Sequence, residues 1–137
     1  MAVATLVGDL SKGLVPVLIA PLVTDWAPFQ GIVALVAFCG HCWSAYLNFQ
    51  GGKGVATATG AMLPIAPLAT GLAAATWIGV VMLTKRSSVA ALVGSIALSG
   101  FIALLHTEAL WIAITMSLGV LLRHRKNIHA LATGQAQ

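Results

Sequence analysis

The residues with the clearest chemical potential are a lysine among glycines, Gly51-Gly52-Lys53-Gly54. Glycine has no Cβ, so backbone N–H groups in such a turn can approach a ligand closely. The apolar run from Val55 predicts a helix that begins directly after the turn, with the positive end of its dipole directed at the same place. The lysine adds a full positive charge, and the predicted ligand is therefore a phosphate group. A tight or re-entrant turn without a ligand is the alternative interpretation.

Three further side chains are candidates for the catalytic step, namely His41, Ser87 and Ser88. His41 lies near the end of an apolar segment, where a histidine contacts a substrate or hydrogen-bonds to a neighbouring helix. Ser87 and Ser88 open another apolar segment and would be ordinary helix N-caps. They would also place two hydroxyls and the free N–H groups of a helix N-terminus opposite the Lys53 turn, where an oxyanion could be stabilised.

The composition indicates which elements must position these residues. Of the 137 residues, 59% are hydrophobic and 7% are charged, and the mean hydropathy is +0.98. A soluble domain has about 25% charged residues, so this chain has too little polar surface for a water-soluble globule. The predicted fold class is all-α, a polytopic bundle of transmembrane helices. Residues 1–137 are expected to form a single membrane-embedded domain.

About six membrane spans are expected, each of roughly 20 apolar residues unless it is short or broken. The expected spans are Leu10–Val23, Phe29–Leu47, Val55–Ile65, Leu68–Leu83, Ser88–Leu105 and Leu110–Leu122. With this number of spans, every Lys and Arg falls on one side of the membrane, and two of the three acidic residues fall on the other. This asymmetry is typical of cytoplasmic loops, so the Lys53 turn is expected at the cytoplasmic face.

Other polar features carry weaker signals. Asp9 and Lys12 are three residues apart on one helical face at the edge of an apolar segment, which indicates an ion pair or a site. Cys39 and Cys42 match a disulfide-isomerase tetrapeptide, but they lie inside an apolar segment, which favours packing over redox chemistry. The sequence has no metal-ligand spacing and no Ser-His-Asp arrangement, so no metal or cofactor is expected. The basic residues are scattered in ones and twos, which argues against nucleic acid as a partner.

Four segments of the chain resemble the bacterial acyl-phosphate:glycerol-3-phosphate acyltransferases. Similar to the second signature of that family are Gly40-His41 and Phe49-x-Gly51-Gly52-Lys53-Gly54-x-Ala56-Thr57. Similar to the third signature is Thr84-Lys85-x-Ser87-Ser88-Val89-Ala90-Ala91. The remaining similar segments are Gly8-Asp9-x-x-Lys12-Gly13 and His124-Arg125-x-Asn127-Ile128-x-x-Leu131-x-x-Gly134. The first signature, Ser-Gly-Asn-x-Gly-Ala-Thr-Asn, and the span before it have no counterpart, and Ala130 and Ala136 replace an arginine and a glutamate.

The resemblance implies a seven-span enzyme of the bacterial inner (cell) membrane, inserted in a multi-pass manner with its active face toward the cytoplasm. It implies transfer of a fatty acyl group from acyl phosphate to the 1-hydroxyl of glycerol 3-phosphate, giving lysophosphatidate for phospholipid biosynthesis. No metal or cofactor is implied. The expected catalytic residues are Ser87, Ser88 and His41. The expected phosphate-binding residues are Gly51, Gly52, Lys53, Gly54, Lys85, His124 and Asn127.

Acyl phosphate is already activated, so positioning and charge neutralisation could suffice without an enzyme nucleophile. The alternative function is that of a truncated or degenerate membrane homologue, which keeps the fold but is catalytically inactive, as the absent first signature would suggest. A small transporter is a third hypothesis. It would require charged residues deep within the spans, and His41 is the one candidate.

Overall fold

The computed structural model describes residues 2–134, and all regular secondary structure in this part of the chain is helical. The α-helices are α1 (Ala2–Ile19), α2 (Ala27–Cys42), α3 (Val55–Met62), α4 (Pro67–Thr84), α5 (Ser87–Leu105), α6 (Leu110–Arg123) and α7 (Arg125–Ala132). Short 3₁₀ helices are η1 (Ala20–Leu22), η2 (Ala45–Leu47) and η3 (Thr107–Ala109). The all-α fold class predicted from the sequence is confirmed.

Within residues 2–134, four segments are long and apolar enough to cross a membrane. They are Val3–Leu22, Ala27–Leu47, Pro67–Thr84 and Ser87–Leu105. The helices at the two other expected spans are shorter. With 8 and 14 residues, α3 and α6 are about 12 Å and 21 Å long, less than the roughly 30 Å of a hydrocarbon core. The first helix begins at Ala2, well before the expected Leu10, and the Asp9–Lys12 ion pair lies within it at 2.9 Å.

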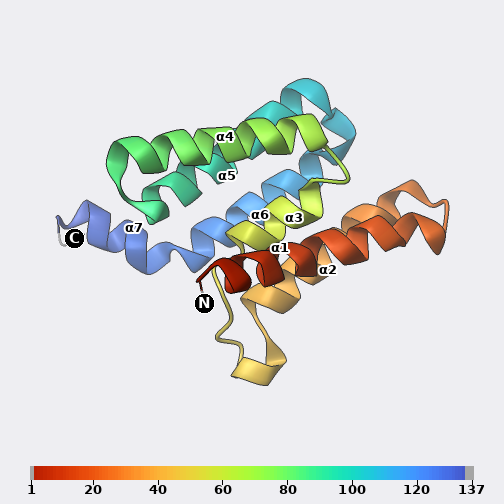
Figure 1. Ribbon diagram of the computed structural model, residues 1–137, viewed down its shortest axis with the longest axis horizontal. Helices are drawn as coiled ribbons and strands as arrows, with labels where there is room; N and C mark the ends of the chain where they lie inside the picture. The colour runs from red at the N-terminus through yellow and green to blue at the C-terminus, as the bar shows by residue number, and fades with distance from the viewer. Residues whose placement is uncertain (1, 135–137) are drawn as a thin grey trace.

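The two shorter helices lie in the middle of the bundle. Figure 1 shows α3 and α6 between the α4–α5 hairpin and the pair formed by α1 and α2. In agreement with this view, α3 contacts α1, α2 and α4, and α6 contacts α2 and α5. The ends of a helix have unsatisfied backbone groups, which lipid cannot satisfy. A short helix is therefore tolerated at this position because it is packed among other helices.

The helices α1 and α3 cross with their backbones in contact. A Cβ atom on Gly60 would lie 2.0 Å from the carbonyl oxygen of Leu10, and one on Gly13 would lie 2.1 Å from that of Thr57. At the same crossing, the Thr57 hydroxyl donates a hydrogen bond of 3.0 Å to the Asp9 carbonyl. Small residues at such crossings let helices in membranes approach closely. The crossing thereby fixes the middle of α1 relative to α3.

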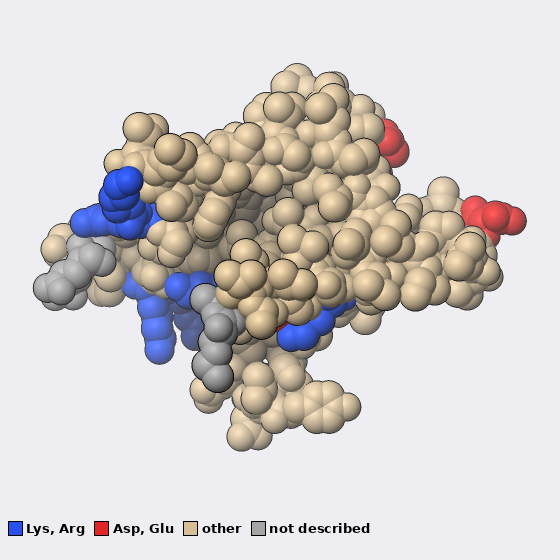
Figure 2. All heavy atoms as spheres, viewed as in Figure 1, with Lys and Arg blue, Asp and Glu red and all other residues tan. Residues whose placement is uncertain are grey.

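The charged side chains are distributed unevenly along the molecule. Figure 2 shows most Lys and Arg toward the end that carries the C-terminus, one basic group near the middle, and acidic groups at the opposite end. Asp25 lies in the connection between α1 and α2, and Glu108 lies in η3. Figure 1 places both of these connections at the end away from the C-terminus. Apart from the Asp9–Lys12 pair within α1, most basic and acidic residues are thus separated along the long axis of the bundle.

We expect Gly60→Ala to destabilise the bundle, because its methyl group would collide with the backbone carbonyl of Leu10, which cannot rotate away. Overpacking of this kind costs about 1–3 kcal/mol. The unfolding temperature of the variant in detergent micelles would measure the loss of stability. The control is Gly100→Ala, whose Cβ would meet nothing within 4 Å and which should unfold at or slightly above the wild-type temperature. Equal unfolding temperatures for the two variants would contradict the close approach of α1 and α3.

Candidate active site

A cavity of about 600 Å³ extends between α1 and the α4–α5 hairpin, with α3 and α6 forming its inner wall. Figure 2 shows the molecular surface hollowed between α4 and α1. One end of the cavity gathers polar groups from separate parts of the chain, namely Asp9, His41, Gly52, Lys53, Gly54, Ser87, Ser88 and His124. Farther along the same helices, the lining is mostly apolar and includes Ala73, Ala74, Trp77, Ala91, Leu98 and Met116.

The glycines of the Lys53 turn are required by packing against the C-terminal end of α2. A Cβ on Gly51 would lie 2.0 Å from the His41 carbonyl oxygen, and one on Gly52 would lie 2.1 Å from His41 Nε2. Gly54 has φ +82°, and a Cβ there would lie 2.4 Å from the Phe38 ring. The Gly52 N–H donates a hydrogen bond of 3.2 Å to the His41 carbonyl. The turn is therefore held close to α2 by its own backbone and packing.

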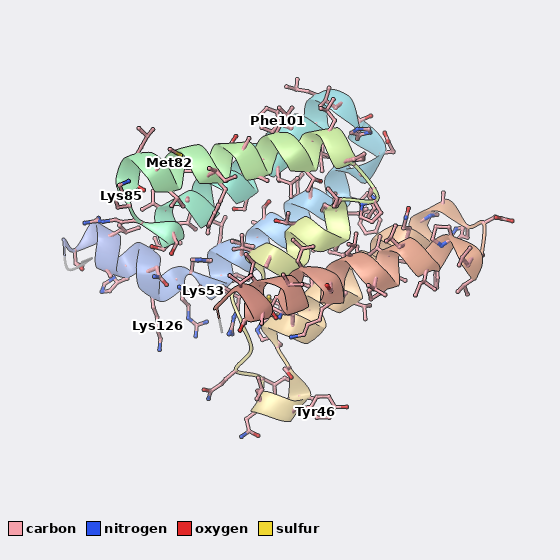
Figure 3. All side chains as sticks on the ribbon, viewed as in Figure 1. Tyr46, Lys53, Met82, Lys85, Phe101 and Lys126 are labelled. Carbon is pink, nitrogen blue, oxygen red and sulfur yellow. The ribbon has the colours of Figure 1, made fainter. Side chains whose placement is uncertain are left out.

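Lys53 lies at the rim of the cavity with an exposed side chain. Figure 3 shows it on the segment that leads into α3, near the first turns of α1. Gly54 is the N-cap of α3, so the first N–H groups of that helix follow directly. Among residues 2–134, no carboxylate lies within ion-pair distance of the Lys53 ammonium. The positive charge is thus available to an anion in the cavity.

The Asp9 carboxylate lies near both Lys12 and the imidazole of His41. The Asp9 Oδ1 atom lies 2.9 Å from Lys12 Nζ and 3.6 Å from His41 Nδ1. With Nδ1 facing the carboxylate, the Nε2 atom of His41 lies beside Gly52, on the side of the turn that lines the cavity. The three-residue spacing of Asp9 and Lys12 correctly predicted an ion pair, but it did not reveal that a histidine from α2 shares the carboxylate.

Ser87 and Ser88 both line the cavity at the start of α5. Neither is the N-cap residue: Arg86 holds that position with extended geometry and makes no side-chain cap hydrogen bond. The expectation that the serines cap the helix is therefore wrong. They are its first two residues, where the N–H groups have no partner within the helix. Ser88 is half-buried and Ser87 is exposed, so hydroxyls and N–H groups meet at one edge of the cavity.

His124 is buried at the junction of α6 and α7, and its Nδ1 atom lies 2.9 Å from the Val120 carbonyl oxygen. Because a carbonyl oxygen only accepts hydrogen bonds, Nδ1 carries a proton, and Nε2 is an acceptor when the ring is neutral. Burial lowers the pKa of His124, and the nearby Lys53 charge lowers it further, while the bond to Val120 opposes both effects. A neutral ring suits a hydroxyl group of a ligand, whereas a protonated ring would suit phosphate.

Seven of the ten site residues predicted from the sequence line this cavity. Gly51 does not, although its carbonyl group takes part in holding the turn. Lys85 ends α4 in the left-handed conformation and borders a separate pocket of about 350 Å³ together with Arg86 and the two serines. Asn127 is half-buried on α7 and is also outside the cavity lining.

Among residues 2–134, no group of three His, Cys, Asp or Glu side chains could hold a metal ion.

Comparison with known proteins identifies a family whose sequence model matches almost the whole chain. The sequence model of the family described as glycerol-3-phosphate acyltransferase matches residues 1–134. The glycerol-3-phosphate acyltransferase of Geobacter sulfurreducens is 39% identical over 136 residues, which are 98% of this chain and 70% of that protein. The corresponding protein of Pseudomonas fluorescens is 43% identical over 135 residues, 98% of this chain and 71% of the relative. The chain thus spans about 70% of the length of these relatives.

Two solved structures have the same fold. Both are crystal structures of PlsY (YgiH), an integral membrane glycerol 3-phosphate acyltransferase, in its lysophosphatidic acid form and its glycerol 3-phosphate form. Each superimposes with a TM-score of 0.91 at 28% identity over 98% of this chain, covering 70% and 69% of the two PlsY chains respectively. The resemblance inferred from the motifs is confirmed, and the fold is that of an integral membrane protein. The chain therefore belongs to the glycerol-3-phosphate acyltransferase family.

Proposed function

We propose that this protein transfers a fatty acyl group from acyl phosphate to the 1-hydroxyl of glycerol 3-phosphate. The products are lysophosphatidate, an intermediate of phospholipid biosynthesis, and inorganic phosphate. The observation that carries this proposal is that one cavity joins polar groups suited to phosphates with an apolar interior suited to a lipid tail. The similarity to PlsY in its glycerol 3-phosphate and lysophosphatidic acid forms supports both the substrate and the product.

The protein acts as a single membrane-embedded domain of the bacterial inner membrane. The Lys and Arg residues gather at the end of the bundle that carries the polar part of the cavity. Cytoplasmic loops of membrane proteins are enriched in these residues, so the polar part faces the cytoplasm. Glycerol 3-phosphate enters from the aqueous side, while the tail of acyl phosphate stays within the bilayer.

The Lys53 turn binds the phosphate of glycerol 3-phosphate. Its ammonium provides the charge, and the N–H groups at the start of α3 provide hydrogen-bond donors together with the positive end of the helix dipole. His124, held with Nε2 as an acceptor, is placed on the cavity wall to receive a hydrogen bond from a glycerol hydroxyl. This contact would select a polyol phosphate over inorganic phosphate.

The start of α5 binds acyl phosphate. Ser87, Ser88 and the first N–H groups of the helix hold its phosphate or the oxyanion that develops at the acyl carbonyl. Lys85 borders the neighbouring pocket together with the two serines and contributes positive charge there, whereas Asn127 lines neither pocket. The acyl chain extends along the apolar side chains of α4, α5 and α6, among them Trp77, Leu98 and Met116.

In the reaction, the 1-hydroxyl oxygen of glycerol 3-phosphate attacks the acyl carbonyl carbon and forms the ester bond. The bond from that carbon to the phosphate oxygen breaks, and phosphate leaves with the electron pair. His41, whose Nδ1 atom lies near the Asp9 carboxylate, takes the hydroxyl proton on Nε2. Since acyl phosphate is already activated, charge neutralisation and positioning provide the remaining rate enhancement.

The alternative, a catalytically inactive homologue, has no supporting observation in the described part of the chain. Loss of function would remove the requirement to keep polar side chains together in an apolar bundle, where they are costly. Lys53, the serine pair and both histidines nevertheless line one cavity, although they come from distant parts of the sequence.

We expect Lys53→Ala and Ser88→Ala to lower kcat/KM for glycerol 3-phosphate and acyl phosphate, each by about tenfold to a hundredfold, as befits the loss of a hydrogen bond to a charged group. Lys53→Ala should act mainly through the KM of glycerol 3-phosphate. The rate at which inorganic phosphate is released from palmitoyl phosphate in micelles would give kcat and KM for both variants. Undiminished rates in an active preparation would refute the assigned roles.

A change of His41 tests its role in proton transfer. His41→Asn keeps a polar side chain but cannot take up the proton, so kcat should fall by about a hundredfold or more. The wild-type rate should decline at acidic pH as the base becomes protonated, and the variant should lose this decline. An unchanged kcat in the variant would contradict the assignment of His41 as the proton acceptor.

Ala74 and Ala75 offer a matched test of the acyl site. Ala74 lines the cavity and Ala75 is exposed on the outer face of α4. We expect Ala74→Phe to reduce turnover of palmitoyl phosphate much more than turnover of octanoyl phosphate, because the ring occupies space that the longer chain requires. Ala75→Phe should leave the ratio of the two rates unchanged. The same ratio in both variants would contradict binding of the chain along α4.

A further inference from the structure

Arg123, the last residue of α6, lies against the Lys53 turn. Its Nε atom donates a hydrogen bond of 3.0 Å to the Gly52 carbonyl, and its Nη2 atom donates one to the Gly51 carbonyl. The guanidinium carbon lies 5.9 Å from the centre of the Trp43 ring, within the range of a cation–π interaction. One side chain from the end of α6 therefore binds two consecutive carbonyl groups of a turn that precedes α3.

These two hydrogen bonds determine which way the peptide groups of the turn face. In a trans peptide, the N–H points away from the carbonyl of the preceding residue. With the Gly51 carbonyl bound by Arg123, the Gly52 N–H faces the His41 carbonyl, to which it donates at 3.2 Å. With the Gly52 carbonyl also bound, the Lys53 N–H is turned away from the guanidinium. In the described part of the chain, no backbone acceptor is hydrogen-bonded to that N–H.

We infer that Arg123 is a positioning residue for phosphate recognition. It binds the two carbonyl oxygens whose partial negative charge would repel an anion, and it leaves the Lys53 ammonium and N–H for the ligand. A glycine-rich turn can flip its peptide planes at little steric cost. The two hydrogen bonds from Arg123 keep these peptide planes in one orientation. This inference rests on the proposed binding of glycerol 3-phosphate at the Lys53 turn.

A direct contact between Arg123 and phosphate is the competing interpretation. Gly52 and Lys53 line the cavity, whereas Arg123 does not. Its planar fork is matched to two adjacent carbonyls, an arrangement that a lysine ammonium on a flexible stem does not reproduce. Arg123→Lys therefore separates the two roles, because it keeps the positive charge but loses the paired hydrogen bonds.

The test uses the full chain in detergent micelles and compares Arg123→Ala, Arg123→Lys and Lys126→Ala. Lys126 is an exposed basic residue three positions later, and Figure 3 shows it pointing outward from α7. One measurement is the KM for glycerol 3-phosphate. The other is hydrogen–deuterium exchange of the segment 43–54 by mass spectrometry, with and without glycerol 3-phosphate.

We expect Arg123→Ala to raise the KM about tenfold or more, with a smaller effect on kcat, and to speed exchange in segment 43–54. Arg123→Lys should show a smaller rise in KM and a smaller increase in exchange. Lys126→Ala should show neither change. Wild-type exchange in Arg123→Ala, or a wild-type KM in Arg123→Lys, would overturn the inference. If the wild-type chain transfers no acyl group, the proposed function fails, and the exchange measurement still decides whether Arg123 holds the turn.

Discussion

The contact between the backbones of α1 and α3 is the constraint on which the rest of the site depends. Gly13 and Gly60 allow the two helices to touch, and the hydroxyl of Thr57 joins them by a hydrogen bond to the Asp9 carbonyl. Because α3 is too short to hold its own place in a membrane, this contact sets the position of its first residue. The Lys53 turn then has a fixed end at α3 and a second support at the C-terminal end of α2.

The polar end of the cavity is assembled from groups that satisfy one another before any substrate binds. The Asp9 carboxylate is neutralised by Lys12 and approached by His41, and the carbonyls of the turn are bound by Arg123. In an apolar bundle each of these groups would be costly without its partner. Lys53 is the Lys or Arg residue that lines the cavity. Among the described residues, no carboxylate lies within ion-pair distance of its ammonium group. The proposed binding of an anion at Lys53 thus depends on the other charged groups of the site already having partners.

Much of this site could be predicted because its chemistry depends on residue type and short spacing, as with the glycines around Lys53. The end of α3 was predicted less closely, because the expected span Val55–Ile65 followed the apolar run. The helix ends at Met62, two residues before Pro64, which lacks the N–H that a further helical turn requires. The role of Arg123 was also hidden, because a basic residue at a helix end can equally face solvent. Only the fold shows that a turn 71 residues earlier provides its acceptors.

The hollow between α4 and α1 opens on a side of the bundle that is parallel to its long axis, not at an end (Figures 1 and 2). A substrate with a lipid tail can thus reach the reaction centre by lateral diffusion within one leaflet, without exposing its hydrocarbon chain to water. The relevant concentration of such a substrate is its mole fraction in the membrane. Diluting the protein together with its lipid in buffer should therefore leave the supply of acyl donor unchanged, while the supply of the water-soluble acceptor falls.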